Sequence, residues 1–169
     1  MSEAIEAERS FVDKFPDEAR VVRAALLSSF LALALGAIFG IIQTLHRTDV
    51  ARIIPSTDYY TVLTAHGVFM VISFTIFFLV GLFTWAVTRS LDRPLVDIRI
   101  TWTWYAIMAV GMTMTGVSIL AGFVPALDMS ADVLFTFYAP LQAHPMFYAG
   151  LAVFIVGSWI AGADWFRTF

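Results

Sequence analysis

The histidine at position 66 is the side chain in this sequence with the clearest potential for chemistry. His66 lies within the stretch from Tyr60 to Val87, which contains no formally charged residue. A polar group that enters hydrocarbon without a partner is costly, so an ionisable residue in such a stretch is a functional candidate. The sequence has no cysteine, which excludes thiolate ligands. A metal would therefore be bound by histidine, carboxylate, methionine or tyrosine, or arrive within a cofactor.

His66 has three possible roles: a hydrogen-bonded structural histidine, a metal or haem ligand, or a proton-relay group. Burial favours the neutral imidazole, which has the lone pair that iron needs. Helical spacing predicts that Leu63, Phe69, Met70 and Ser73 share its face and form an apolar wall of the kind that raises a haem potential. The second ring nitrogen of a ligand histidine also needs an acceptor, which could be a hydroxyl, a carbonyl or water.

The other two histidines fall at the ends of predicted helices. His46 ends the first apolar stretch and His144 begins the fourth, so both suit the interface with water and headgroups. One alternative gives His144 a larger role: in a stand-alone four-helix membrane cytochrome, His66 and His144 would bind one haem from opposite sides. Pro140 and Pro145 flank His144, however, and indicate a helix start at the interface.

Composition indicates the elements that position these histidines. The sequence is 60% hydrophobic and 14% charged, against roughly 25% charged in soluble domains. Four apolar stretches can each cross about 30 Å of hydrocarbon as a helix, and the alternation typical of strands is absent. We expect an all-α integral membrane protein with a polar tail, residues 1–23, and a four-helix transmembrane part, residues 24–169. The predicted antiparallel spans are about residues 24–45, 60–87, 101–127 and 141–163.

Small residues recur every four positions along the first predicted span, at Ser28, Ala32, Gly36 and Gly40. Such a stripe lets another helix or a flat ligand approach closely, and helix packing is the simpler explanation. Gly40 and His66 are predicted at a similar depth in the membrane, roughly 8–9 Å from the outer end of their spans. A planar macrocycle standing on edge would then fit between them.

The distribution of basic residues predicts the orientation. All Lys and Arg except Arg47 and Arg52 lie before the first span, between the second and third, or after the fourth. The positive-inside rule therefore predicts that both ends of the chain are cytoplasmic. No basic cluster of the kind that binds nucleic acid is present.

Three motifs resemble a known family. The stretch 58–70, DYYTVLTAHGVFM, resembles the second transmembrane helix of subunit I of the haem-copper oxidases. The stretch 133–148, VLFTFYAPLQAHPMFY, resembles the entry to the fourth helix in B-family (ba-type) enzymes, and the stretch 36–43, GAIFGIIQ, resembles the end of the first helix. The resemblance covers nearly all of the chain and implies the first third of a subunit I fold with twelve or more helices.

The resemblance also implies a function. His66 would be one of two axial ligands of low-spin haem b, in an enzyme that reduces dioxygen to water and translocates protons. Its partners would be the remaining helices of subunit I, subunit II, a cytochrome c or small copper protein as electron donor, and the lipid of a prokaryotic plasma membrane. A non-redox membrane scaffold, with His66 only hydrogen-bonded, is the remaining alternative.

The sequence departs from the family pattern in three places. Residues 90–97 lack the asparagine-rich proton-entry pattern of the A-family, which agrees with the B-family. Phe135 stands where a related chain can have tyrosine, so a hydroxyl-dependent role there is in doubt. The second haem b ligand and the ligands of the other haem and the copper belong to later helices. We therefore expect no catalytic residue here, and a fragment or split subunit that does not reduce oxygen by itself.

Overall fold

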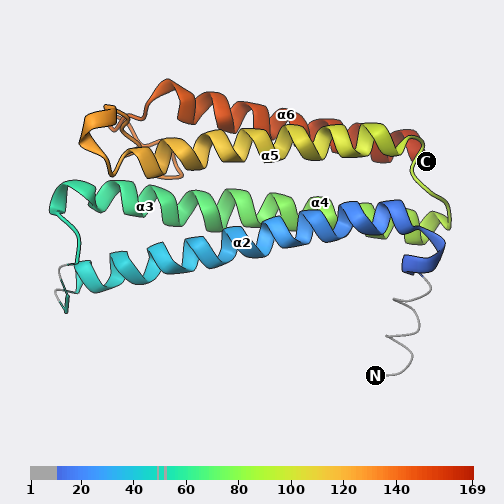
Figure 1. Ribbon diagram of the computed structural model, residues 1–169, viewed down its shortest axis with the longest axis horizontal. Helices are drawn as coiled ribbons and strands as arrows, with labels where there is room; N and C mark the ends of the chain where they lie inside the picture. Colours follow the sequence, from blue (N-terminus) through green and yellow to red (C-terminus); the bar gives the residue numbers. More distant parts are fainter. Residues whose placement is uncertain (1–10, 49, 52) are drawn as a thin grey trace.

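The computed structural model describes residues 11–48, 50–51 and 53–169, and this part of the chain is helical apart from its connections. Four stretches of helix in it are long and apolar enough to cross a membrane, which confirms the predicted all-α, four-span fold (Figure 1). The second span is continuous through a π-helix, η2. The elements are α2 (Pro16–Arg47), η1 (Ser56–Asp58), α3 (Tyr59–Gly67), η2 (Val68–Phe74), α4 (Thr75–Leu91), α5 (Ile98–Ala121), η3 (Pro125–Leu127) and α6 (Pro145–Thr168).

The helices do not coincide with the apolar stretches. Helix α2 begins at Pro16, inside the predicted polar tail, because proline suits a first helical turn and the acidic Asp17 and Glu18 follow it. Helix α5 ends at Ala121 and α6 begins only at Pro145. The residues between them form an irregular connection with one isolated bridge, so the third predicted span was too long at its end and the fourth began too early.

The four spans form two pairs that pack on each other. Helix α2 packs along α3, η2 and α4, and α5 packs along α6. Figure 1 shows the start of α2 and the C-terminus at one end of the bundle, and the connection between α5 and α6 at the other. We call these the terminal end and the loop end.

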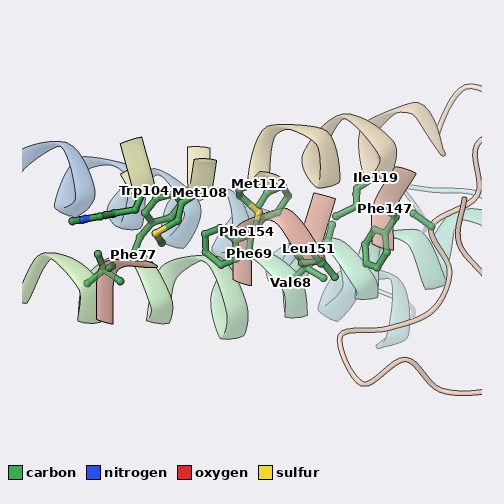
Figure 2. Close-up of a cluster of buried hydrophobic side chains, with 14 of the residues drawn as sticks. Val68, Phe69, Phe77, Trp104, Met108, Met112, Ile119, Phe147, Leu151 and Phe154 are labelled. Carbon is green, nitrogen blue, oxygen red and sulfur yellow. The ribbon is translucent and has the colours of Figure 1, made fainter. Parts of the chain in front are cut away.

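The core lies where α5 and α6 meet the second span. Figure 2 shows Trp104 and Met108 of α5, Phe154 of α6 and Phe77 of α4 gathered there, and three of them are fully buried while Phe77 is 3% exposed. Gly111 lets α5 and α6 approach, because a Cβ there would lie 2.6 Å from the carbonyl oxygen of Gly150. Helices α5 and α6 are therefore in direct backbone contact at this position.

At the terminal end, the connection between α4 and α5 is tied to the start of α2. The buried Glu18 accepts a hydrogen bond from the backbone N–H of Leu95 at 3.0 Å. Lys14 forms an ion pair with Asp92, whose φ is 54°. This second link is exposed and adds little stability, whereas the first satisfies a buried backbone donor.

Candidate functional site

His66 lies near the end of α3, about two turns from its first residue, and its side chain turns toward α2. Its Nδ1 lies 2.8 Å from the carbonyl oxygen of Gly36. A carbonyl only accepts, so Nδ1 must carry the proton, and the neutral tautomer then has its lone pair on Nε2. Within the described part of the chain, Nε2 has no hydrogen-bond partner. The acceptor that the sequence left open is thus a backbone carbonyl.

The small-residue stripe of α2 is in direct contact with the second span. A Cβ at Gly40 would lie 2.8 Å from both Cε1 and Nδ1 of His66, and one at Gly36 would overlap Met70. Helix packing therefore accounts for most of the stripe. The predicted place for a macrocycle, between Gly40 and His66, was wrong, because the imidazole itself occupies that space.

A groove of about 350 Å³ lies beside the imidazole, on the surface of α2 and α3. The side-chain oxygen Oε1 of Gln43, in this groove, is buried and has no hydrogen-bond partner among the described residues. The groove therefore borders the His66 ring on the side of Gln43 and Thr44. The lining residues are Ala37, Gly40, Ile41, Gln43, Thr44, Leu45 and His66.

The predicted wall around His66 was wrong in part. Phe69 and Ser73 line a different groove, of about 300 Å³, together with residues of α2 and α5 such as Met112. Met70 packs against Gly36. The physical reason is the π-helix that starts at Val68, since its wider turn rotates the following residues away from their α-helical positions.

His46 and His144 have local roles. The ring of His46 packs against Tyr59 with centroids 5.6 Å apart. His144 is the N-cap of α6, and its Nδ1 accepts the backbone N–H of Met146 at 3.2 Å. Neither histidine lines the groove beside His66, so the structure does not bring His144 and His66 to one site.

The connection between α5 and α6 holds the helical turn that carries His66. The hydroxyl of Thr64 donates to the carbonyl of Tyr60 at 2.8 Å and accepts the backbone N–H of Leu134 at 2.9 Å. The ring of Phe135 lies on Gly67, where a Cβ would come within 2.5–2.9 Å of it. Leu134 has a φ of 61°, a strained value for a leucine that only firm contacts can maintain. Thr64, Gly67 and the connection thus fix α3 at His66.

The sequence matches the family described as Cytochrome C and Quinol oxidase polypeptide I over residues 20–169. The chain belongs to this family. It is 33% identical over 144 residues to cytochrome c oxidase subunit 1 of Thermus thermophilus, covering 80% of this chain and 24% of that protein. It is also similar to a solved structure of a haem-copper terminal oxidase dimer, with a TM-score of 0.74 and 30% identity over 88% of this chain and 26% of that one. The chain thus spans about a quarter of the length of these relatives.

Membership in the oxidase subunit I family confirms the resemblance to subunit I of the haem-copper oxidases. The residues beside His66 fit the haem that the family implies: a neutral imidazole with Nε2 unused, a glycine under its ring, and an unpartnered polar atom at Gln43. Within the described residues, no group of three or more His, Asp or Glu could hold a metal ion.

Sequence analysis did not identify Thr64 and Gly67 as residues that position His66. Thr64 is completely buried and Gly67 is buried on the same short helix, but their partners come from a segment about 70 positions further along the chain. The sequence feature that could have indicated a contact of α3 with another segment is the pair of threonines at a spacing of three, Thr61 and Thr64. The hydroxyl of Thr61 also donates a hydrogen bond to this connection, to the carboxylate of Asp132 at 2.5 Å.

Proposed function

We propose that this chain is the N-terminal portion of the catalytic subunit of a haem-copper oxidase, and that Nε2 of His66 is one axial ligand of its low-spin haem b. When bound, such a haem accepts and passes on single electrons. In the complete enzyme these electrons reduce dioxygen to water, and the reaction is coupled to proton translocation. This chain by itself does not perform that reaction.

The hydrogen bond between Nδ1 of His66 and the carbonyl of Gly36, at 2.8 Å, is the observation that carries the proposal. Ligand histidines almost always donate their second N–H to an acceptor, which fixes the tautomer and raises the basicity of the ligating nitrogen. A merely structural histidine on this helix would be expected to use both nitrogens. Here only one is used within the described residues, and the ring borders a groove.

The surrounding residues each have a defined part in this site. The Gly36 carbonyl holds the proton on Nδ1, and Gly40 leaves room for the imidazole. Thr64 and Gly67 hold the turn of α3 against the connection between α5 and α6. The ligand is thereby oriented by contacts inside this chain, which lowers the cost of binding a planar group.

The wider assembly is part of the same proposal. The B-family pattern around residues 90–97 and 133–148 favours a ba-type enzyme in a prokaryotic plasma membrane, with the terminal end of the bundle in the cytoplasm. The remaining helices of subunit I supply the second haem b ligand, the other haem and the copper site. Subunit II and a cytochrome c or small copper protein deliver the electrons.

Substitution of the ligand in the complete oxidase tests the assignment. We expect His66→Ala to abolish the low-spin haem signal in the reduced-minus-oxidised optical spectrum, while subunit I still inserts and assembles. His46→Ala is the matched control, because His46 lies at the same end of the bundle but packs on Tyr59 outside the groove. It should leave the signal unchanged.

A low-spin signal of normal size and position in His66→Ala would show that the ligand is elsewhere. Restoration of the signal by added imidazole would identify the missing group as the ring itself. If His46→Ala lost the signal equally, the effect would be general destabilisation and not ligation.

A further inference from the structure

A second groove, of about 370 Å³, lies at the terminal end of the bundle between the start of α2 and the second half of α4. Figure 1 shows these two segments side by side at that end. This groove shares no residue with the groove beside His66, and the proposed haem site makes no use of it. We call it the terminal groove.

Apolar side chains form the walls of the terminal groove. Phe11 and Val12, which precede α2, line it together with Trp85 of α4. The rings of Phe11 and Trp85 lie 6.4 Å apart between their centroids. Further along, a Cβ at Gly81 would lie 3.4 Å from the side chain of Leu26, so α2 and α4 are in close contact beside the groove.

The dimensions of the terminal groove suit an acyl chain better than a helix. From Trp85 to Phe78 it extends about 10 Å along α4, at 1.5 Å per residue. A volume of about 370 Å³ over this length gives a cross-section of about 37 Å². A helix with its side chains is at least about 10 Å across, so its cross-section is about twice as large. Another helix could cover the groove but could not enter it.

Arg23 is the one charged side chain among the described residues that line the terminal groove. It is exposed, and no ion pair or hydrogen bond joins its guanidinium to another described residue. Two other bases at this end are paired, Lys14 with Asp92 and Arg20 with Asp17. The Arg23 guanidinium therefore keeps its donors for a phosphate, the group that its planar geometry matches.

The polar and apolar parts of the terminal groove follow the layers of a membrane. Arg23 directly precedes the apolar stretch that begins at Ala24, and Trp85 lies at the same end of α4, where an aromatic ring suits the interface. Leu26 and Phe78 lie deeper in their helices. A cation at the level of the headgroups, with an apolar groove leading inward from it, complements an anionic phospholipid.

We propose that the terminal groove binds one anionic phospholipid. The guanidinium of Arg23 binds its phosphate, and one acyl chain lies along Leu26, Phe78 and Leu82. The site is independent of the ligation at His66.

An apolar groove elsewhere in the bundle provides an internal comparison. It has a volume of about 430 Å³ on α5 and α6, and Trp102, Val110 and Val153 are among its lining residues. None of the described residues that line it is charged. We expect this comparison groove to accept acyl chains without preference for a headgroup.

Photochemical labelling of the complete oxidase tests the site. The delipidated enzyme is placed in phosphatidylcholine nanodiscs with a small fraction of a lipid that carries a diazirine in its acyl chain. This probe is either phosphatidylglycerol or phosphatidylcholine, and the labelled peptides are identified by mass spectrometry. On residues 78–85 we expect roughly tenfold more label from phosphatidylglycerol, as one charge-assisted contact would give. The comparison groove should be labelled equally by both probes.

Three variants separate the headgroup contact from general charge. Arg23→Gln should abolish the excess of phosphatidylglycerol label on residues 78–85, whereas Arg23→Lys keeps the cation and should retain most of it. Arg93→Gln is the matched control, because Arg93 is also an exposed base at the terminal end but lies outside the groove. It should leave the labelling unchanged. Unlabelled phosphatidylglycerol should compete with the probe, and inorganic phosphate should not.

Several results would overturn the proposal. Equal labelling of the terminal groove by the two probes, or an excess that survives Arg23→Gln, would show that no headgroup is recognised there. Competition by inorganic phosphate would identify a site for the ion and not for the lipid. Label in the comparison groove but none on residues 78–85 would show that another part of the complex covers the terminal groove. Each result is read while the low-spin haem spectrum, and therefore the His66 assignment, stays intact.

Discussion

Gly40→Ala places one methyl group between α2 and the proposed haem ligand. The added Cβ would lie 2.8 Å from Cε1 and Nδ1 of His66, closer than carbon and nitrogen atoms can approach without displacement. The imidazole must then turn or α2 must move away. Either response lengthens the bond from Nδ1 to the Gly36 carbonyl, which is now 2.8 Å.

The expected size of the effect follows from three opposing contributions. Alanine is favoured over glycine in a helix by about 1 kcal/mol. Overpacking a tight contact costs typically about 1–3 kcal/mol, and loss of the hydrogen bond costs about 0.5–1.5 kcal/mol. Gly40→Ala should therefore be destabilising by roughly 0.5–3.5 kcal/mol. The main structural change should be a displacement of the His66 ring.

The assay follows the low-spin haem band of the complete oxidase during heating, together with its position at room temperature. Gly162→Ala is the matched control, because a Cβ there meets nothing within 4 Å. Gly116→Ala is a second control, with an ordinary contact of 3.6 Å to Phe69. We expect both to be neutral or slightly stabilising, and Gly40→Ala alone to shift and weaken the band. Equal behaviour of Gly40→Ala and Gly162→Ala would refute the packing of His66 on α2.

Other substitutions test the fold around the site. Thr64→Val leaves the partly buried backbone N–H of Leu134 unpaired and should destabilise by about 1–3 kcal/mol. The low-spin haem band should broaden, and Thr64→Ser should restore it. An unaltered band in the valine variant would contradict the positioning role. Glu18→Ala should cost a similar amount in thermal unfolding through the N–H of Leu95, whereas Glu18→Gln keeps an acceptor and should cost less. The sequence has no cysteine, so Ser90→Cys should react with an impermeant thiol reagent only from the cytoplasmic side and Thr136→Cys only from outside; the reverse pattern would invert the proposed topology.

The sequence predicted the number and type of the spans because the apolar stretches alone determine which segments can lie in lipid. It did not predict the exact bounds of the helices. Helix α2 begins at Pro16, outside the apolar stretch, and α6 begins at Pro145, four residues after the start of the predicted span. It also did not predict the π-helix at Val68. An apolar stretch can accommodate either helix type, and tertiary packing decides between them.

Of the candidate site, only His66 could be predicted from the sequence. The depth of His66 follows from its position along an uncharged stretch, and the need for an acceptor follows from its chemistry. Which acceptor it finds depends on how α2 lies against α3. The burial of Asp164 was not predicted, because an aspartate near the end of an apolar stretch looks like an interfacial residue. Its burial depends on Thr101 and Trp104, some 60 positions earlier in the chain.

The contacts around His66 explain how this chain can orient the imidazole that we propose as a haem ligand. Every group that orients the imidazole belongs to the described chain: the Gly36 carbonyl, the surface of Gly40, and the turn held by Thr64 and Gly67. The groove beside the ring lies on the surface of the bundle, so a haem bound as we propose would be covered on its other side by residues outside this chain. Because these contacts already hold the imidazole in the folded chain, the entropy of orienting His66 would be lost on folding and not on binding of the proposed haem.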